Sequence, residues 1–181
     1  VNTISNLLIY VFNALATGGA VVASQALGAK KKETGKIVAN QLILICIIFS
    51  VIIAGICILF DRQILTLIYG KVEPEVMEQA VTYLFITGFS FPFISVYDGA
   101  SSLLRSMGKA STSLIVSAIM NGINILCNAI FVFGYGMGIA GVGYGTLISR
   151  VVAGLIVIVL LRNEKYDLHI CLLYTSPSPR D

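Results

Sequence analysis

The stretch LILICIIFSVIIAGICILF, residues 42–60, decides the fold class of this chain. Its only ionisable side chains are the thiols of Cys46 and Cys57. Its length is close to the roughly 20 residues that a helix needs to cross the hydrocarbon core of a bilayer. Of the 181 residues, 57% are hydrophobic and 12% are charged, whereas about a quarter are charged in a typical globular domain. The sequence therefore predicts an all-α, polytopic membrane protein and excludes a soluble domain.

Further apolar segments follow the same pattern, so a signal peptide or a single anchor cannot explain it. The five predicted transmembrane helices lie near residues 3–27, 37–60, 77–103, 112–133 and 139–161. Both ends of the chain look unnatural, because it opens at Val1 without Met and closes on a Ser/Pro-rich stretch, residues 171–181. That stretch resembles a read-through tail, and we interpret the chain as a fragment with a non-native end.

Charged residues lie between the predicted helices, and the intervals alternate in charge. The basic intervals hold Lys30, Lys31, Lys32 and Lys36, then Arg105 and Lys109, then Arg162 and Lys165; the interval 61–75 is mixed and 134–138 is uncharged. Excess Lys and Arg in short loops marks the cytoplasmic side. We therefore expect the basic intervals in the cytoplasm, Glu73 and Glu75 outside, and a multi-pass protein of the plasma membrane, with a bacterial inner membrane favoured.

Other function classes find little support in the composition. The formal net charge is +3, but the basic residues form no patch with interleaved aromatics, so we expect no nucleic-acid partner. Cys46, Cys57, Cys127 and Cys171 form no CxxC pair, and the first three lie in apolar segments, as is typical of buried, reduced thiols. No metal-ligand cluster or catalytic constellation stands out, so we expect neither an enzyme nor a cofactor.

Polar side chains form stripes on four of the five predicted helices, since residues three and four apart share a helix face. The stripes are Asn2, Asn6, Tyr10, Asn13, Thr17 and Ser24; Thr87, Ser90, Tyr97, Ser101 and Arg105, with Asp98 adjacent; Ser113, Ser117, Asn121, Asn124 and Asn128; and Gly143, Thr146, Arg150 and Gly154. The helix near 37–60 has only Ser50 in its middle, so we expect residues 43–56 to face lipid.

Two interpretations of the stripes stay open. Polar residues can hold helices together in lipid, each hydrogen bond contributing about 1 kcal/mol or less, or they can line a water-accessible cavity. Adhesion is favoured for a single Ser or Thr, but three carboxamides on one face exceed what adhesion needs. We expect a shared interior, which Asn13, Tyr97, Asn124 and Thr146 face; the expected cavity-lining residues are Asn13, Thr17, Tyr97 and Asp98.

Two ionisable residues fall within the predicted spans, where charge is costly and commonly marks function. Asp98 follows Pro92, which should kink its helix. Asp98 is either a functional carboxylate or a group near the cytoplasmic end that reaches water or pairs with a base. Arg150 is expected to form a structural or gating ion pair, because an inward cation suits a cation carrier poorly.

A glycine motif, GMGIAG at residues 136–141, satisfies the dinucleotide-binding pattern G-x-G-x-x-G. That pattern requires a preceding strand and an acidic residue about 20 positions further on. Neither is present, so we interpret these glycines as a tight turn with close helix packing.

Four segments in register resemble the MATE (multidrug and toxic compound extrusion) family of transporters. They are SQALGAK at 24–30, LLRSMGK at 103–109, NILCN at 124–128, and GMGIAG at 136–141 followed by Thr146. The resemblance implies a twelve-helix protein of two lobes, of which residues 1–162 would be helices two to six in the N-terminal lobe. Residues 163–181 would then be a cytoplasmic end plus the tail.

The resemblance also implies a site. The family's N-lobe cation site uses an acid on helix one, polar residues on helix five and a Thr on helix six. Carried over by motif, this names Asn124, Asn128 and Thr146, with Asn121 on the same stripe, as cation- or substrate-binding residues. Asn128 stands where some members have Asp, and the helix-one acid would lie upstream of Val1.

The implied activity is secondary active efflux of multiple drugs or organic cations by Na⁺ or H⁺ antiport with alternating access. The implied partners are the lipid bilayer, small amphiphilic or cationic substrates, and the missing first helix and C-terminal lobe. Two alternatives stay open. One is a flippase of lipid-linked oligosaccharides with a related fold, which should line its cavity with several cations, whereas Arg150 is the only mid-span one. The other is a non-transporting membrane scaffold.

Overall fold

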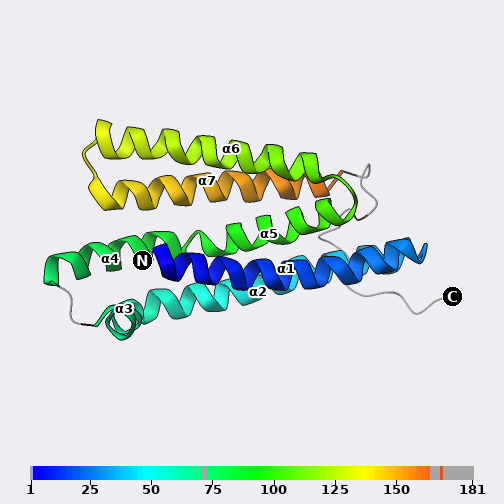
Figure 1. The fold of residues 1–181 in the computed structure, drawn as a ribbon, viewed down its shortest axis with the longest axis horizontal. Coiled ribbons are helices and arrows are strands. Elements are labelled where there is room, and N and C mark those ends of the chain that lie inside the picture. Colours follow the sequence, from blue (N-terminus) through cyan, green and yellow to red (C-terminus); the bar gives the residue numbers. More distant parts are fainter. Residues whose placement is uncertain (1, 71–72, 164–167, 169–181) are drawn as a thin grey trace.

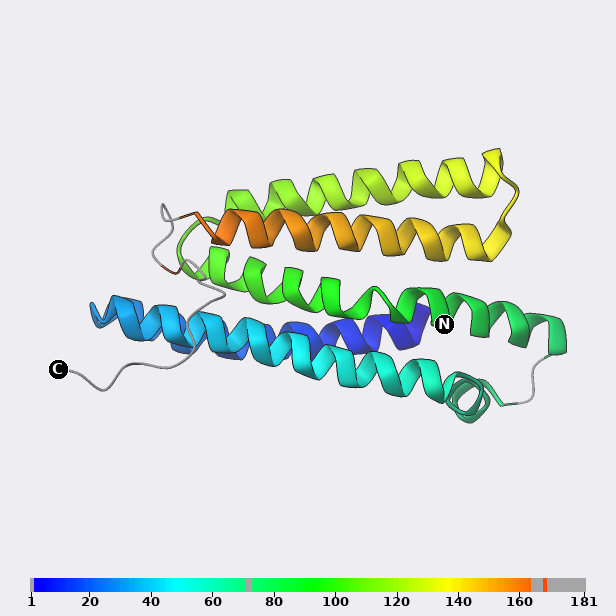
Figure 2. The ribbon, with the colours of Figure 1, turned by 180° about the vertical axis from the view of Figure 1, so that it is seen from behind.

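The computed structural model describes residues 2–70, 73–163 and 168, and shows a bundle of long helices (Figures 1 and 2). α1 (Asn2–Gly28) and α2 (Lys32–Leu59) run antiparallel, joined by a tight turn in which Lys30 has a φ of 60°. In the described residues, four helices are long and apolar enough to cross a membrane, and a fifth if a bent pair counts as one span. The predicted all-α, polytopic fold class is confirmed.

The bent pair replaces the single helix predicted near residues 77–103. α4 (Pro74–Gly88) and α5 (Phe91–Ser106) meet at an angle of 49°. Pro92 lies in the first turn of α5; it has no N–H to donate, and its ring excludes the carbonyl of Gly88 four residues earlier. Ser90 closes the break, because its Oγ donates to the carbonyl oxygen of Thr87 at 2.5 Å. The sequence predicted a kink, and the structure shows a break.

A short helix, α3 (Asp61–Tyr69), occupies the interval that the sequence analysis treated as a mixed loop. Figure 1 shows it end-on while α2 runs across the view, so α3 lies across the end of the bundle. Leu65 is 1% exposed and Leu67 is 87% exposed, so one face packs against the bundle and the other does not. Charged residues at its start make this segment unsuitable as a span, but not as an amphipathic helix.

The last helical pair begins with α6 (Ala110–Asn128), which continues as a π-helical turn, η1 (Ala129–Gly134), and returns as α7 (Gly138–Leu161). Gly136 and Gly138 have φ values of 66° and 55°, which favour glycine in the turn. The ideal Cβ position of Gly141 lies 3.0 Å from Phe131 Cβ. The interpretation of GMGIAG as a tight turn with close packing is confirmed.

The main core lies where α1, α2 and α5 meet. Phe12 and Phe91 are fully buried, with their ring centroids 6.2 Å apart. α7 packs on α5, and α6 packs on α7 (Figures 1 and 2). Small residues allow the close approach of α7, since the ideal Cβ of Gly154 lies 3.2 Å from the carbonyl oxygen of Phe93.

The orientation predicted for the middle of α2 is wrong on one face. Ile43, Cys46 and Ser50 are buried, and the Oγ of Ser95 on α5 donates to the carbonyl oxygen of Cys46 at 3.1 Å. On the opposite face, Ile48 and Ile52 are about half exposed. In an apolar helix, hydrophobicity does not separate a lipid-facing side from a helix-facing side, because both environments are apolar.

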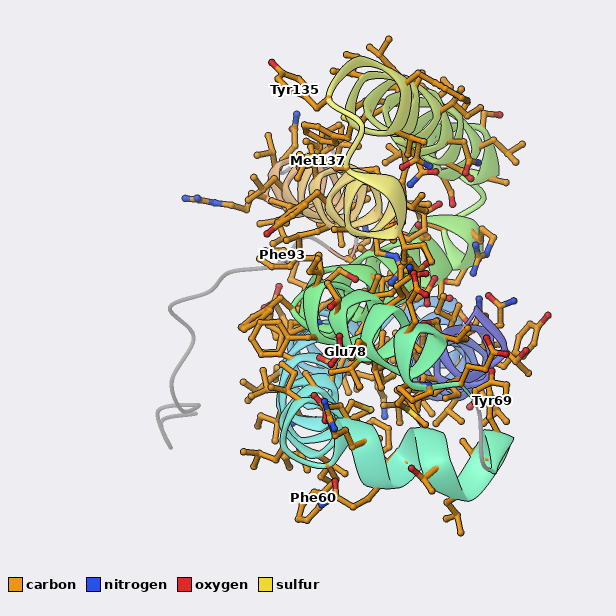
Figure 3. The ribbon with its side chains drawn as sticks, turned by 90° about the vertical axis from the view of Figure 1, so that its left-hand side faces the viewer. Phe60, Tyr69, Glu78, Phe93, Tyr135 and Met137 are labelled. Atoms are coloured by element: carbon orange, nitrogen blue, oxygen red, sulfur yellow. The ribbon has the colours of Figure 1, made fainter. Side chains whose placement is uncertain are left out.

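The loops sort to the two ends of the bundle. One end holds the α1–α2 turn, the α5–α6 turn and the end of α7, and thus Lys30–Lys32, Lys109 and Arg162 (Figure 1). The opposite end, which faces the viewer in Figure 3, holds Phe60, Tyr69, Glu78, Tyr135 and Met137. The structure therefore groups the basic intervals together, as five consecutive crossings require. That this end is cytoplasmic stays a prediction.

Candidate functional site

A chain of side-chain hydrogen bonds joins α6 to α7. Asn128 Nδ2 donates to Asn124 Oδ1 at 3.0 Å. Asn124 Nδ2 lies 3.4 Å from Thr146 Oγ1 and 3.3 Å from Ser149 Oγ, which both accept. The hydroxyls donate onward to the backbone of α7, from Thr146 to Val142 at 2.9 Å and from Ser149 to Thr146 at 2.9 Å. Both hydroxyl protons are thereby committed, so the hydroxyl oxygens can only accept.

One oxygen at the start of this chain has no donor. Asn128 Oδ1 is buried and without a hydrogen-bond partner. Exchanging the oxygen and nitrogen of this carboxamide would set its oxygen against Asn124 Oδ1, an acceptor facing an acceptor, so the chain fixes its orientation. A buried acceptor without a partner costs about 1–3 kcal/mol. We call these groups the α6–α7 cluster (Asn124, Asn128, Thr146 and Ser149, with Gly145 against Asn128). The cluster therefore presents a neutral oxygen that a proton donor or a small cation would satisfy.

Helix geometry explains how α6 presents these groups. Asn124 and Asn128 are one turn apart and share a face, whereas Ile125, 70% exposed, lies on another. The π-helical turn begins immediately after Asn128, and such turns often occur at functional sites. Asn124 and Asn128 face α7 as predicted, whereas Asn121 on the same stripe is exposed. The role of Asn124 and Asn128 in binding an ion stays a prediction.

Two residues of this cluster are absent from the predicted set. Ser149 lies three residues after Thr146 on α7, and that spacing is the signal that could have found it. Gly145 gives the Asn128 carboxamide its place, because a Cβ on Gly145 would collide with Asn128 Oδ1. No sequence signal separates Gly145 from the other glycines of α7, since the requirement comes from a neighbouring helix.

The remaining predicted site residues lie outside this cluster. Asn121 is exposed on α6. On α1, Thr17 Oγ1 donates to Asn13 Oδ1 at 3.3 Å. Tyr97 and Asp98 are 8% and 6% exposed, so both are buried among helices in this chain.

Arg150 does not form the expected ion pair. Its Nη1 donates to Ser90 Oγ at 2.8 Å, at the break between α4 and α5. Among the described residues, no carboxylate lies within salt-bridge distance of it. Asp98 is eight residues further along α5 than Ser90, or about 12 Å at 1.5 Å per residue. The Arg150 guanidinium reaches Ser90 instead, which lies at the break between α4 and α5 next to Pro92.

Comparison with known proteins assigns the family. A family profile described as MatE matches residues 1–130. The chain belongs to the MatE family. Among its MatE relatives, Multidrug export protein MepA of Staphylococcus haemolyticus is 28% identical over 166 residues, covering 92% of this chain and 36% of the relative. Probable multidrug resistance protein YoeA of Bacillus subtilis is 31% identical over 166 residues, covering 90% of this chain and 35% of the relative.

Solved MATE structures share the fold. A transporter in an inward-facing conformation superposes with a TM-score of 0.86 at 24% identity, covering 95% of this chain and 39% of that one. An outward-facing conformation gives a TM-score of 0.86 at 24% identity, covering 98% and 39%. The resemblance seen in the sequence is thus confirmed, and the chain is part of a multi-pass helical membrane protein. It spans little more than a third of the length of these MatE relatives.

Proposed function

We propose that the complete protein containing this chain exports drugs, organic cations or related amphiphiles in exchange for Na⁺ or H⁺. The MatE relatives in Staphylococcus haemolyticus and Bacillus subtilis are named as a multidrug export protein and a probable multidrug resistance protein. The observation that carries the coupling part of the proposal is the α6–α7 cluster, with its unpartnered Asn128 Oδ1. The protein is then a transporter and not an enzyme, and residues 1–162 form part of its N-terminal lobe.

The α6–α7 cluster would hold the coupling ion without carrying charge of its own. Carboxamide and hydroxyl oxygens are hard, neutral ligands that suit an alkali cation or the proton of a carboxylic acid. Asn128 Oδ1 supplies the open acceptor, and Asn124 and Thr146 hold it in place through the hydrogen-bond chain. An antiporter must make binding of ion and substrate mutually unfavourable. A titrating acid elsewhere in the protein would provide that charge.

Alternating access is supported by the similarity of this chain to MATE transporters in two conformations. The chain superposes equally well on an inward-facing and an outward-facing MATE transporter, with a TM-score of 0.86 in each case. A unit that keeps its shape in both states can rock as a rigid body against a second lobe. The bilayer would be the plasma membrane, with the basic end of the bundle in the cytoplasm.

Transport by the full-length protein in proteoliposomes tests this proposal. We expect ethidium to move against its gradient when an opposing H⁺ or Na⁺ gradient is imposed, and to stop when an ionophore collapses that gradient. Empty liposomes are the control. Movement of a lipid-linked oligosaccharide in place of ethidium would indicate the flippase alternative. Absence of any ion-driven movement in protein shown to be folded would indicate a scaffold.

A further inference from the structure

Asp98 is a buried carboxyl group with one oxygen that has no hydrogen-bond partner. It is the buried acidic side chain of the described residues, only 6% exposed, and its Oδ2 has no hydrogen-bond partner. One turn further along α5, the fully buried Ser101 Oγ is also unpartnered. Residues three apart share a helix face, so the two unsatisfied side chains lie on the same side of α5 inside the bundle. A buried ionised carboxylate without a partner is among the costliest groups a protein can hold.

The nearby cations do not satisfy Asp98 in this arrangement. Arg105 and Arg150 both interact with it electrostatically, yet each donates to a serine hydroxyl instead. Arg105 Nη2 lies 2.8 Å from Ser102 Oγ, and Arg150 Nη1 lies 2.8 Å from Ser90 Oγ. Both guanidinium groups therefore have serine partners, and neither donates a hydrogen bond to Asp98 Oδ2.

We propose that Asp98 is a proton-binding site of this lobe, with the proton on Oδ2 and Ser101 Oγ as its acceptor. The ionised carboxylate could accept from the Ser101 hydroxyl, but its negative charge would stay buried. A proton on Oδ2 removes that charge and turns Oδ2 into a donor, so rotation of the two side chains lets one hydrogen bond to Ser101 Oγ give both unsatisfied oxygens a partner. When Asp98 releases the proton to water on the open side of the protein, the bare carboxylate attracts the Arg150 guanidinium and weakens its bond to Ser90. Proton and guanidinium thus compete for one carboxyl group.

A proton suits this position better than a metal cation. Alkali and alkaline-earth ions need several oxygen ligands, whereas a proton needs one carboxyl oxygen and one acceptor. The groups that face Asp98 leave no such ligand set. They are Arg105 on α5, Arg150 on α7 and Cys46 on α2. α1 has no charged residue, and Tyr10, its one ionisable side chain in the described part, is exposed.

Arg150 connects this site to the rest of the lobe. It follows Ser149, which accepts from Asn124 in the α6–α7 cluster. Its other contact, Ser90, closes the break between α4 and α5. Loss of the proton from Asp98 would therefore draw the Arg150 side chain toward Asp98. That movement would shift α7 next to the proposed ion site and weaken the Arg150–Ser90 bond at the break between α4 and α5. For the coupling role, this inference rests on the proposed function; the protonation itself does not.

Infrared spectroscopy of the full-length protein, with ¹³C-labelled aspartate, tests the inference without requiring transport. We expect a carboxylic-acid C=O band that shifts with the label, grows on acidification, and disappears in Asp98→Asn but not in Glu75→Gln, which removes an exposed carboxylate. Because a neighbouring cation favours the ionised acid, Arg150→Gln should let the band persist to higher pH, and this variant keeps the test valid should Asp98→Asn fold poorly.

Ethidium export in the same variants separates the two proposals. Asp98→Asn should lose H⁺-driven export about tenfold or more while still binding ethidium, and Glu75→Gln should match the wild type. If the band is absent from the wild type, or is unaffected by both Asp98→Asn and Arg150→Gln, the inference is wrong even if export is intact. If the band behaves as expected but no variant or wild type exports ethidium, the proposed function fails and the proton site stands.

Discussion

Carboxamides suit the α6–α7 cluster because each supplies both a donor and an acceptor. Asn124 accepts from Asn128 with one atom and donates to Thr146 and Ser149 with the other. The donor and acceptor of each hydrogen bond are therefore fixed by the next bond in the chain. This order leaves Asn128 Oδ1 as the acceptor without a donor. A serine or threonine at position 128 is too short to hold the same oxygen in the same place.

Gly145→Ala tests the position of the Asn128 carboxamide without changing any polar residue. The added methyl group collides with Asn128 Oδ1, so the carboxamide must move, at a cost of about 1–3 kcal/mol for overpacking. We expect the apparent affinity for the coupling ion to fall about tenfold or more in a protein that remains folded. The half-saturating H⁺ or Na⁺ concentration for ethidium export measures this.

Gly122→Ala is the matched control, because nothing lies within 4 Å of the ideal Cβ position of Gly122 on α6. It should keep the wild-type ion dependence. If Gly145→Ala also keeps it, the open oxygen of Asn128 has no part in ion binding.

Among the elements, α4 and α5 depend on Pro92 for their 49° bend. Pro92→Ala restores an N–H that can donate to the carbonyl of Gly88, so the break should close and the two helices should straighten. Spin labels at Glu75 and Lys109, at opposite ends of the pair, should then move apart in pulsed electron–electron resonance measurements. The control is Pro74→Ala, because Pro74 is the first residue of α4, where a backbone N–H has no acceptor within the helix. Equal distances in wild type and Pro92→Ala would mean that packing, not Pro92, sets the bend.

Some features of the helices were predictable from the sequence, and others were not. Five apolar segments were predictable because length and hydrophobicity alone select a span. α3 was not, because a nine-residue amphipathic helix has the composition of a polar loop. The buried face of α2 was not predictable either, since the side that packs against Ser95 and Gly99 is as apolar as the exposed side. The inward orientation of Asn124 and Asn128 was predictable, because polar side chains one helical turn apart share a face that can hydrogen-bond to α7; Asn121, on the same stripe, is exposed.

Site residues divide in the same way. Asn124, Asn128 and Thr146 carry polar groups at helical spacing, and the structure brings them together. Gly145 could not be found from the sequence, since its importance depends on where α6 places Asn128. Ser90 as the partner of Arg150 also depends on tertiary structure, because 60 residues separate the two.

For the molecule as a whole, the grouping of basic loops at one end predicts its orientation. Cysteine introduced at Lys31 should be protected from an impermeant thiol reagent in intact cells, and cysteine at Glu75 should react, because Lys-rich loops remain in the cytoplasm. Permeabilised cells provide the control, in which both positions should react. Labelling at Lys31 without labelling at Glu75 in intact cells would reverse the topology.

The central claim is that the α6–α7 cluster sets the ion dependence of export, and Asn128→Asp in the full-length protein tests it most directly. The substitution keeps the size of the side chain and replaces its amide with a carboxyl group, so a titrating charge enters the place where a neutral oxygen stood. We predict that ethidium export by proteoliposomes shifts its dependence on pH or Na⁺, and that Asn124→Ala weakens ion-driven export in a protein of normal expression. Unchanged ion dependence in well-expressed Asn128→Asp and Asn124→Ala proteins would contradict the account.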